Sequence, residues 1–151
     1  MREVNKILVA ICFSEYCDDT FRFAVGLAEQ LQADLLVANV VNIRDVQAVS
    51  TIESMGYSVS SEDYIKGVIE ERQAELEKMV AASGFPRDKV RSIFRVGHPV
   101  GELLKTIKNE GVDLVVMGTK GRSNHPHIFV GSVAEKMFRK SPVTVVSHRR
   151  S

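Results

Sequence analysis

Short, nearly uninterrupted apolar runs alternate along this chain with segments whose apolar residues recur every three or four positions. The apolar runs cover residues 4–11, 35–41, 90–96, 114–117 and 143–146. Runs without polar alternation are typical of strands buried on both faces. Strands that alternate with helices predict an α/β fold: a parallel sheet with helices on both faces and right-handed crossovers. Arg91 and Arg95 interrupt the third run, which favours a place at a sheet edge.

The segments with helical spacing cover residues 14–31, 61–84, 99–111 and 132–139. Their ends carry recognisable signals. Ser14 is typical of a helix start, Ser61-Glu62-Asp63 opens the second helix, and Pro99 suits the first turn of the third. Gly84 is a fitting stop for the second helix.

One segment does not fit this simple alternation. Residues 42–61 are the least regular part of the chain, and we expect there a long surface connection with at most one helical turn. Connections of that length are uncommon unless they are functional or mobile.

Length and composition narrow the classes of protein that this chain can be. Its 151 residues suit one domain spanning residues 1–151. Twenty Lys and Arg against nineteen Asp and Glu leave a net charge of +1, which argues against nucleic acid or a membrane as partner. We expect neither a membrane span nor a signal peptide, because no apolar stretch is long enough. Cys12 and Cys17 make no disulfide framework, which favours a reduced, cytoplasmic protein.

A glycine-containing segment before the last helix carries the clearest chemical signal. It runs from Gly118 through Gly121 and Arg122 to Gly131 and Ser132. Glycines let the backbone approach a ligand, and the amides at a helix N-terminus attract anions. Since ligands of open α/β sheets bind beyond the carboxyl ends of the strands, the pattern predicts a phosphate site. The alternative is that the glycines only form turns; neither a Walker A loop nor a G-x-G-x-x-G fingerprint is present.

The spacing of this segment resembles the nucleotide signature of the universal stress protein family: Gly118, two residues, Gly121, nine residues, then Gly131-Ser132. Residues 6–10, 13–15, 97–99, 112–119, 131–136 and 141–143 are also similar to that family. The resemblance covers the whole chain. It implies a Rossmann-like, five-stranded parallel sheet of order 3-2-1-4-5 and a homodimer. It also implies ATP, or ADP or AMP, in the cleft, with or without Mg²⁺.

The resemblance implies roles for individual residues as well. The glycines, Ser132 and Val133 would hold the phosphates, the Val40 backbone would meet the adenine, and Ala10 would border the nucleoside. The cofactor-binding candidates are Ala10, Ile11, Cys12, Val40, Met117, Gly118, Gly121, Arg122, Gly131, Ser132 and Val133.

Cys12 stands where the nucleotide binders of the family usually have Asp. A carboxylate accepts two strong hydrogen bonds from ribose or base, whereas a thiol is a weak partner. We estimate the loss at roughly 1–3 kcal/mol, or about 5- to 150-fold in affinity. The sequence therefore predicts nucleotide binding of modest affinity.

The remaining reactive residues each have a functional and a structural interpretation. Cys12 and Cys17 are either redox-sensing thiols or small apolar residues. His125 and His127 belong to a polar loop, contact the ligand, or form part of a metal site that lacks its other donors. His98, at the end of a strand, either reaches the cleft or is a surface turn residue, and we expect the surface position. Because no nucleophile–base set or paired carboxylates occur, we expect no catalytic residue and at most slow ATP hydrolysis.

The last apolar run, residues 143–146, is unguarded by charge until His148-Arg149-Arg150. In the implied strand order it lies at a sheet edge. Two such edges can pair across a two-fold axis, which gives a homodimer. The alternative is that a helix or loop of the same chain covers the edge.

Together these features predict a stress-response regulator that binds an adenine nucleotide without fast turnover. The bound nucleotide would bias residues 42–61, or the dimer surface, toward a protein partner. Two alternatives remain open. One is a dimeric interaction protein that has given up nucleotide. The other is a slow ATPase or autophosphorylating protein with Ser132 or Thr119 as acceptor.

Overall fold

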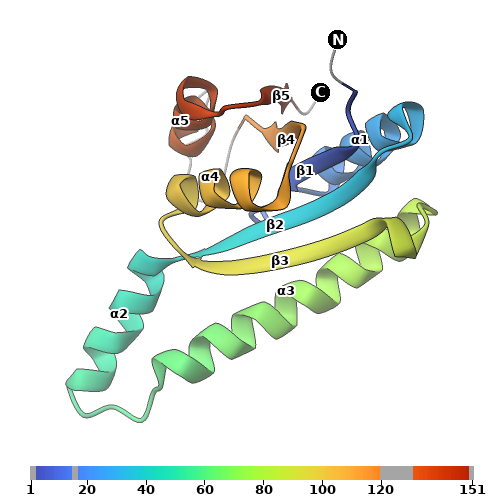
Figure 1. Cartoon of the computed structure of the whole chain (residues 1–151). Helices are drawn as coiled ribbons and strands as arrows, with labels where there is room; N and C mark the ends of the chain where they lie inside the picture. Colours follow the sequence, from blue (N-terminus) through green and yellow to red (C-terminus); the bar gives the residue numbers. More distant parts are fainter. Residues whose placement is uncertain (1–2, 15–16, 120–130, 150–151) are drawn as a thin grey trace.

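Five parallel strands form one sheet in the computed structural model, which describes residues 3–14, 17–119 and 131–149 (Figure 1). The strands are β1 (Lys6–Ala10), β2 (Asp34–Asn42), β3 (Val90–Gly97), β4 (Leu114–Gly118) and β5 (Thr144–His148). Their order is β3-β2-β1-β4-β5, and every neighbouring pair is parallel. The predicted fold class and strand order are confirmed, and β3 lies at an edge as its arginines indicate.

Helices cover both faces of the sheet. One face packs against α1 (Cys17–Leu31) and the C-terminal half of α3 (Ser61–Ser83). The opposite face packs against α4 (Pro99–Glu110) and α5 (Ser132–Lys140). Successive β1 residues point to opposite faces, yet Ile7, Leu8 and Val9 are all fully buried. This two-sided burial explains why the central strands show no polar alternation.

The prediction of a loop over residues 42–61 is wrong. A twelve-residue helix, α2 (Ile43–Ser54), begins where β2 ends. The Asn42 side chain caps it by accepting a hydrogen bond from the Arg44 backbone amide at 3.0 Å. Residues 55–60 then lead to α3, whose Asp63 amide donates to the Ser60 hydroxyl at 3.3 Å. Because α2 buries none of its side chains, its sequence carries no strong core-facing stripe and gave no clear helical signal.

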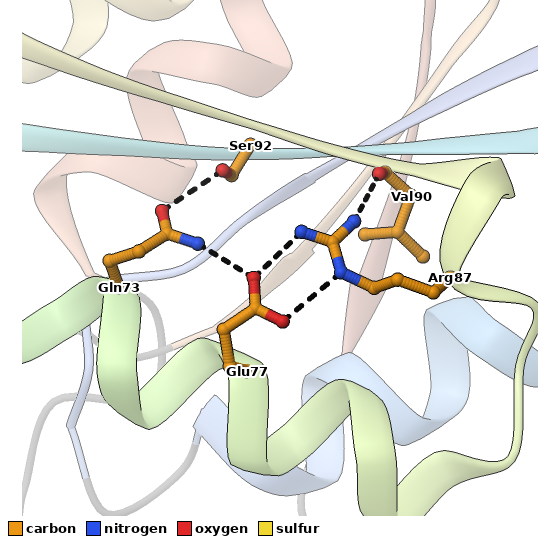
Figure 2. Close-up of polar contacts among 5 residues, drawn as sticks. All are labelled: Gln73, Glu77, Arg87, Val90 and Ser92. Carbon is orange, nitrogen blue, oxygen red and sulfur yellow. Dashed lines mark hydrogen bonds and ion pairs between the residues drawn. The ribbon is translucent and has the colours of Figure 1, made fainter.

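A polar network ties α3 to the edge strand β3 and to the turn before it (Figure 2). Arg87 donates two hydrogen bonds to Glu77, from Nη2 at 2.7 Å and from Nε at 3.1 Å, and a third to the Val90 carbonyl at 2.7 Å. Gln73 donates to Glu77 at 2.9 Å and accepts from Ser92 at 3.1 Å. The network fixes where α3 crosses β3, and with it the direction in which the N-terminal half of α3 leaves the sheet.

Candidate functional site

A cavity of about 360 Å³ lies at the carboxyl ends of the strands. β1 pairs with β2 on one side and with β4 on the other, so the cavity sits at the switch point where the strand order reverses. Nine of the eleven predicted residues line it: Ala10, Ile11, Cys12, Val40, Met117, Gly118, Gly131, Ser132 and Val133. Gly121 and Arg122, like His125 and His127, lie outside the described residues.

One end of the cavity is formed by β4 and the start of α5. Gly131 is the N-cap residue of α5, and its amide donates to the Thr119 carbonyl at 2.5 Å. The first bond within the helix runs from the Glu135 amide to the Gly131 carbonyl, at 3.0 Å. The amides of Ser132 and Val133 come before it and have no intrahelical acceptor, while the helix dipole makes this end positive. The arrangement can bind an anion through backbone donors.

The other end of the cavity is organised by Asn39, which is 3% exposed. Its Nδ2 donates to the Ile11 carbonyl at 2.5 Å, and its Oδ1 accepts from Arg72 Nη1 at 2.8 Å. The Arg72 guanidinium lies over the Phe13 ring, 5.9 Å from the ring centre. Phe13 has a φ of 56°, a conformation that a bulky residue adopts only when its surroundings hold it. Arg72 on α3 therefore fixes the backbone that follows β1.

The two cysteines differ in environment. Cys12 is half-buried in the cavity wall, and its Sγ donates to Ser14 Oγ at 3.4 Å. Cys17 is buried at the start of α1. Burial, followed by the nearby carboxylate of Glu75, raises the pKa of the Cys17 thiol to about 11, so that it stays protonated at neutral pH. Of the two thiols, Cys12 is the one that a ligand in the cavity can touch.

Several lining residues were not predicted as part of the site. The polar ones are Asn39, Asn42, Arg44, Asp45, Arg72 and Thr119. Arg72 had a signal in the sequence, because a charged residue on an apolar helix face needs a partner inside the fold. Asn39 and Asn42 belong to β2, and Arg44 and Asp45 open α2, a helix that the sequence did not predict.

Residues 3–14, 17–119 and 131–149 contain no group of three or more His, Cys, Asp or Glu that could hold a metal ion. Within the same residues no helix combines the length and apolar character needed to cross a membrane. His98 is exposed at the N-cap of α4 and does not line the cavity.

Known proteins are similar to this chain in sequence and in fold. The universal stress protein MJ0577 of Methanocaldococcus jannaschii is 28% identical over 97% of this chain and 97% of its own length. YxiE of Bacillus subtilis, also a universal stress protein, is 32% identical over 94% of this chain and 98% of its own. A solved structure of MJ0577 superposes with a TM-score of 0.77 at 24% identity, over 99% of both chains.

A universal stress protein solved in complex with cAMP superposes with a TM-score of 0.70 at 19% identity, over 99% of this chain and 100% of its own. At these identities the structural likeness shows the fold. The family model described as Universal stress protein family matches residues 3–147, almost the entire chain. The chain belongs to the universal stress protein family.

Proposed function

We propose that the cavity binds an adenine nucleotide, ATP or a related ADP or AMP, with its phosphates at the start of α5. The observation that carries this proposal is the meeting of Gly118, Gly131, Ser132 and Val133 at one end of a cavity that lies at the switch point of the sheet. Backbone amides and the α5 dipole complement a phosphate there. The cAMP complex of a protein with the same fold supports an adenine nucleotide as ligand.

The nucleoside lies toward β1 and β2 in this proposal. Ala10, Ile11 and Met117 border it, and the Val40 backbone meets the adenine. Cys12 lines the same wall and supplies a weak hydrogen-bonding group in place of a carboxylate, so binding is of modest affinity. Any Mg²⁺ takes its ligands mainly from phosphate and water, as Mg²⁺ commonly does.

The nucleotide acts as a regulatory ligand rather than as a substrate for fast turnover. Arg44 and Asp45 at the base of α2, and Arg72 on α3, line the cavity, so occupancy can change how these two helices leave the sheet. A cytoplasmic homodimer through β5 completes the proposal. Val145 and Val146 on that edge strand are only half-buried, although the His148 ring stacks on Phe23 of α1 at 5.0 Å.

Isothermal titration with ATP and AMP tests the proposal, with Ser132→Glu as the decisive variant. A carboxylate at the first position of α5 favours the helix but repels a phosphate, so binding should weaken about tenfold or more while the fold stays stable. Ser132→Ala is the matched control, since it removes the hydroxyl and keeps the amides. Unchanged affinity in Ser132→Glu, or no heat from the unmodified protein at millimolar nucleotide, contradicts the proposal.

Two other functions remain distinguishable by simple experiments. The thiol at Cys12 favours an interaction protein without nucleotide, and native mass spectrometry of the purified protein would then show no added nucleotide mass. A slow ATPase or autophosphorylating protein would transfer label from radiolabelled ATP to Ser132 or Thr119, and Ser132→Ala would remove the label if Ser132 is the acceptor.

A further inference from the structure

Residues 43–75, here called the arm, comprise α2, the connection after it and the N-terminal half of α3. In Figure 1 the arm projects beyond the strands, whereas the C-terminal half of α3 runs along the sheet. α2 buries no side chain, and α3 buries none before Leu76. The two helices of the arm pack on each other, and the arm meets the sheet only at its base, through residues such as Arg72 and Gln73.

The tip of the arm exposes large apolar side chains close together in the chain. Met55 and Tyr57 are 68% and 66% exposed, and Ile52 and Val59 are 43% and 42% exposed. Single exposed apolar residues are ordinary, but four within eight residues at the end of a projecting hairpin indicate a contact surface.

The charge of the arm is opposite to that of the C-terminal part of the chain. The arm carries seven acidic and three basic residues: Asp45, Glu53, Glu62, Asp63, Glu70, Glu71 and Glu75 against Arg44, Lys66 and Arg72. Residues 132–149 carry four basic residues and one acidic: Lys136, Arg139, Lys140 and Arg149 against Glu135. Two arms brought together would therefore repel each other, whereas an arm and a basic surface attract.

The surface of α5 has the matching chemistry. Phe138 is 45% exposed and is flanked by exposed Lys136, Arg139 and Lys140. α5 packs near β5, and α3 packs under β3, at the opposite edge of the sheet (Figure 1). The apolar, acidic surface and the apolar, basic surface thus lie on different parts of one molecule.

We propose that the arm of one copy of this chain binds the α5 surface of a second copy. Apolar contact is made by the exposed side chains of the arm tip and by Phe138, and the acidic arm faces the lysines of α5. The contact joins two different surfaces. In a two-fold dimer the arm of each copy binds the α5 surface of the other, and both surfaces are then occupied. Without such closure, each added copy leaves one arm and one α5 surface open to bind a further copy. It is separate from any pairing of β5 edges, and it does not depend on the nucleotide.

Sedimentation velocity over a range of protein concentrations tests the proposal, at low and at high salt. The unmodified protein is expected to self-associate, and more weakly at high salt because the charges are exposed. Met55→Ser combined with Tyr57→Ser should weaken association about tenfold or more. Leu31→Ser is the matched control: Leu31 on α1 is 43% exposed, as Ile52 is, and its loss should leave association unchanged.

A charge exchange then identifies the partner surface. Glu70→Lys with Glu71→Lys on the arm, or Lys136→Glu with Lys140→Glu on α5, should each weaken association about tenfold. In a mixture of these two double variants both arm–α5 contacts pair opposite charges, one with the original charges and one with the charges exchanged, so the mixture should associate more tightly than either variant alone. Circular dichroism and ATP titration check that each variant is folded, since none of these residues lines the cavity.

Three results overturn the proposal. The first is an unmodified protein that stays monomeric at every concentration. The second is association that the arm variants leave unchanged, which points to the β5 edges instead. The third is weakening by the arm variants without recovery in the mixture, which assigns the arm to a surface other than α5.

Discussion

Replacing Cys12 by aspartate tests how the nucleoside end of the cavity works. Cys12 lines the cavity and is half-buried, so a carboxylate at this position reaches both solvent and a bound ligand. Its Sγ donates to the Ser14 hydroxyl at 3.4 Å, and that hydroxyl can instead donate to a carboxylate. The substitution therefore adds a strong acceptor without burying a lone charge.

The expected gain follows from the hydrogen bonds that a carboxylate accepts. A carboxylate can accept two bonds from ribose hydroxyls, each stronger than any bond to a thiol, but partial exposure reduces their net value. A total of about 1–3 kcal/mol corresponds to ATP binding that is about 5- to 150-fold tighter in Cys12→Asp. Isothermal titration of both proteins with ATP measures this ratio directly.

Two controls test whether the gain in affinity comes from the carboxylate charge and from its hydrogen bonds to the ribose. Cys12→Ser offers a neutral acceptor and should improve binding much less than Cys12→Asp does. Titration with 2′,3′-dideoxy-ATP removes the ribose hydroxyls, and with them most of the difference between Cys12→Asp and the unmodified protein. Equal or weaker ATP binding by a folded Cys12→Asp protein would refute this account of the nucleoside end.

Three further predictions concern stability. Arg72→Met leaves the buried Asn39 oxygen without its 2.8 Å partner and should cost about 1–3 kcal/mol in urea unfolding, whereas a change under 0.5 kcal/mol would contradict its anchoring role. The pKa of the Cys17 thiol is raised to about 11, so its contribution to stability is complete below its ordinary value of 9.0 and is lost as pH rises through 11. The free energy of unfolding of Cys17→Ala should therefore fall less steeply over that pH range than that of the unmodified protein. Identical profiles of unfolding free energy against pH would contradict the raised pKa. Arg87 lowers the pKa of Glu77, so the pair stabilises the fold at neutral pH and ceases to do so in acid. Both side chains are about half exposed, so Arg87→Ala should lower the free energy of unfolding by about 1 kcal/mol or less at pH 7. A larger loss would contradict the weak, solvent-screened character of the pair.

Local patterns were sufficient to predict the sheet. Each central strand is buried on both faces, so its residues are mostly apolar, and that preference is visible in a single run such as Leu114–Met117. Pro99 and Gly84 mark a helix start and a helix end as predicted, with Gly84 in the left-handed conformation at φ 71°. The residues that line the cavity at the start of α5 were also predicted, because Gly131, Ser132 and Val133 are consecutive in the chain.

The features that the sequence did not reveal depend on distant contacts. α2 packs its half-buried side chains on α3 and leaves the rest exposed, so it has no core-facing stripe from which a helix could be predicted. Arg72 and Asn39 are 33 residues apart in the chain and meet only because α3 crosses the end of β2. Residues that reach the cavity because a distant helix crosses the sheet have no spacing pattern in the sequence, whereas residues from a single loop do.

The central claim is that backbone amides at the start of α5 hold the phosphates of a nucleotide. Titration of ¹⁵N-labelled protein with ATP, followed by ¹H–¹⁵N correlation spectra, tests it most directly. We predict that ATP causes saturable shifts of the Gly118, Gly131, Ser132 and Val133 amides and that adenosine shifts them less. The amide of Leu31, the last residue of α1, should not shift with either ligand. Spectra in which ATP leaves these four amides unmoved, or in which adenosine moves them as much as ATP does, would contradict the claim.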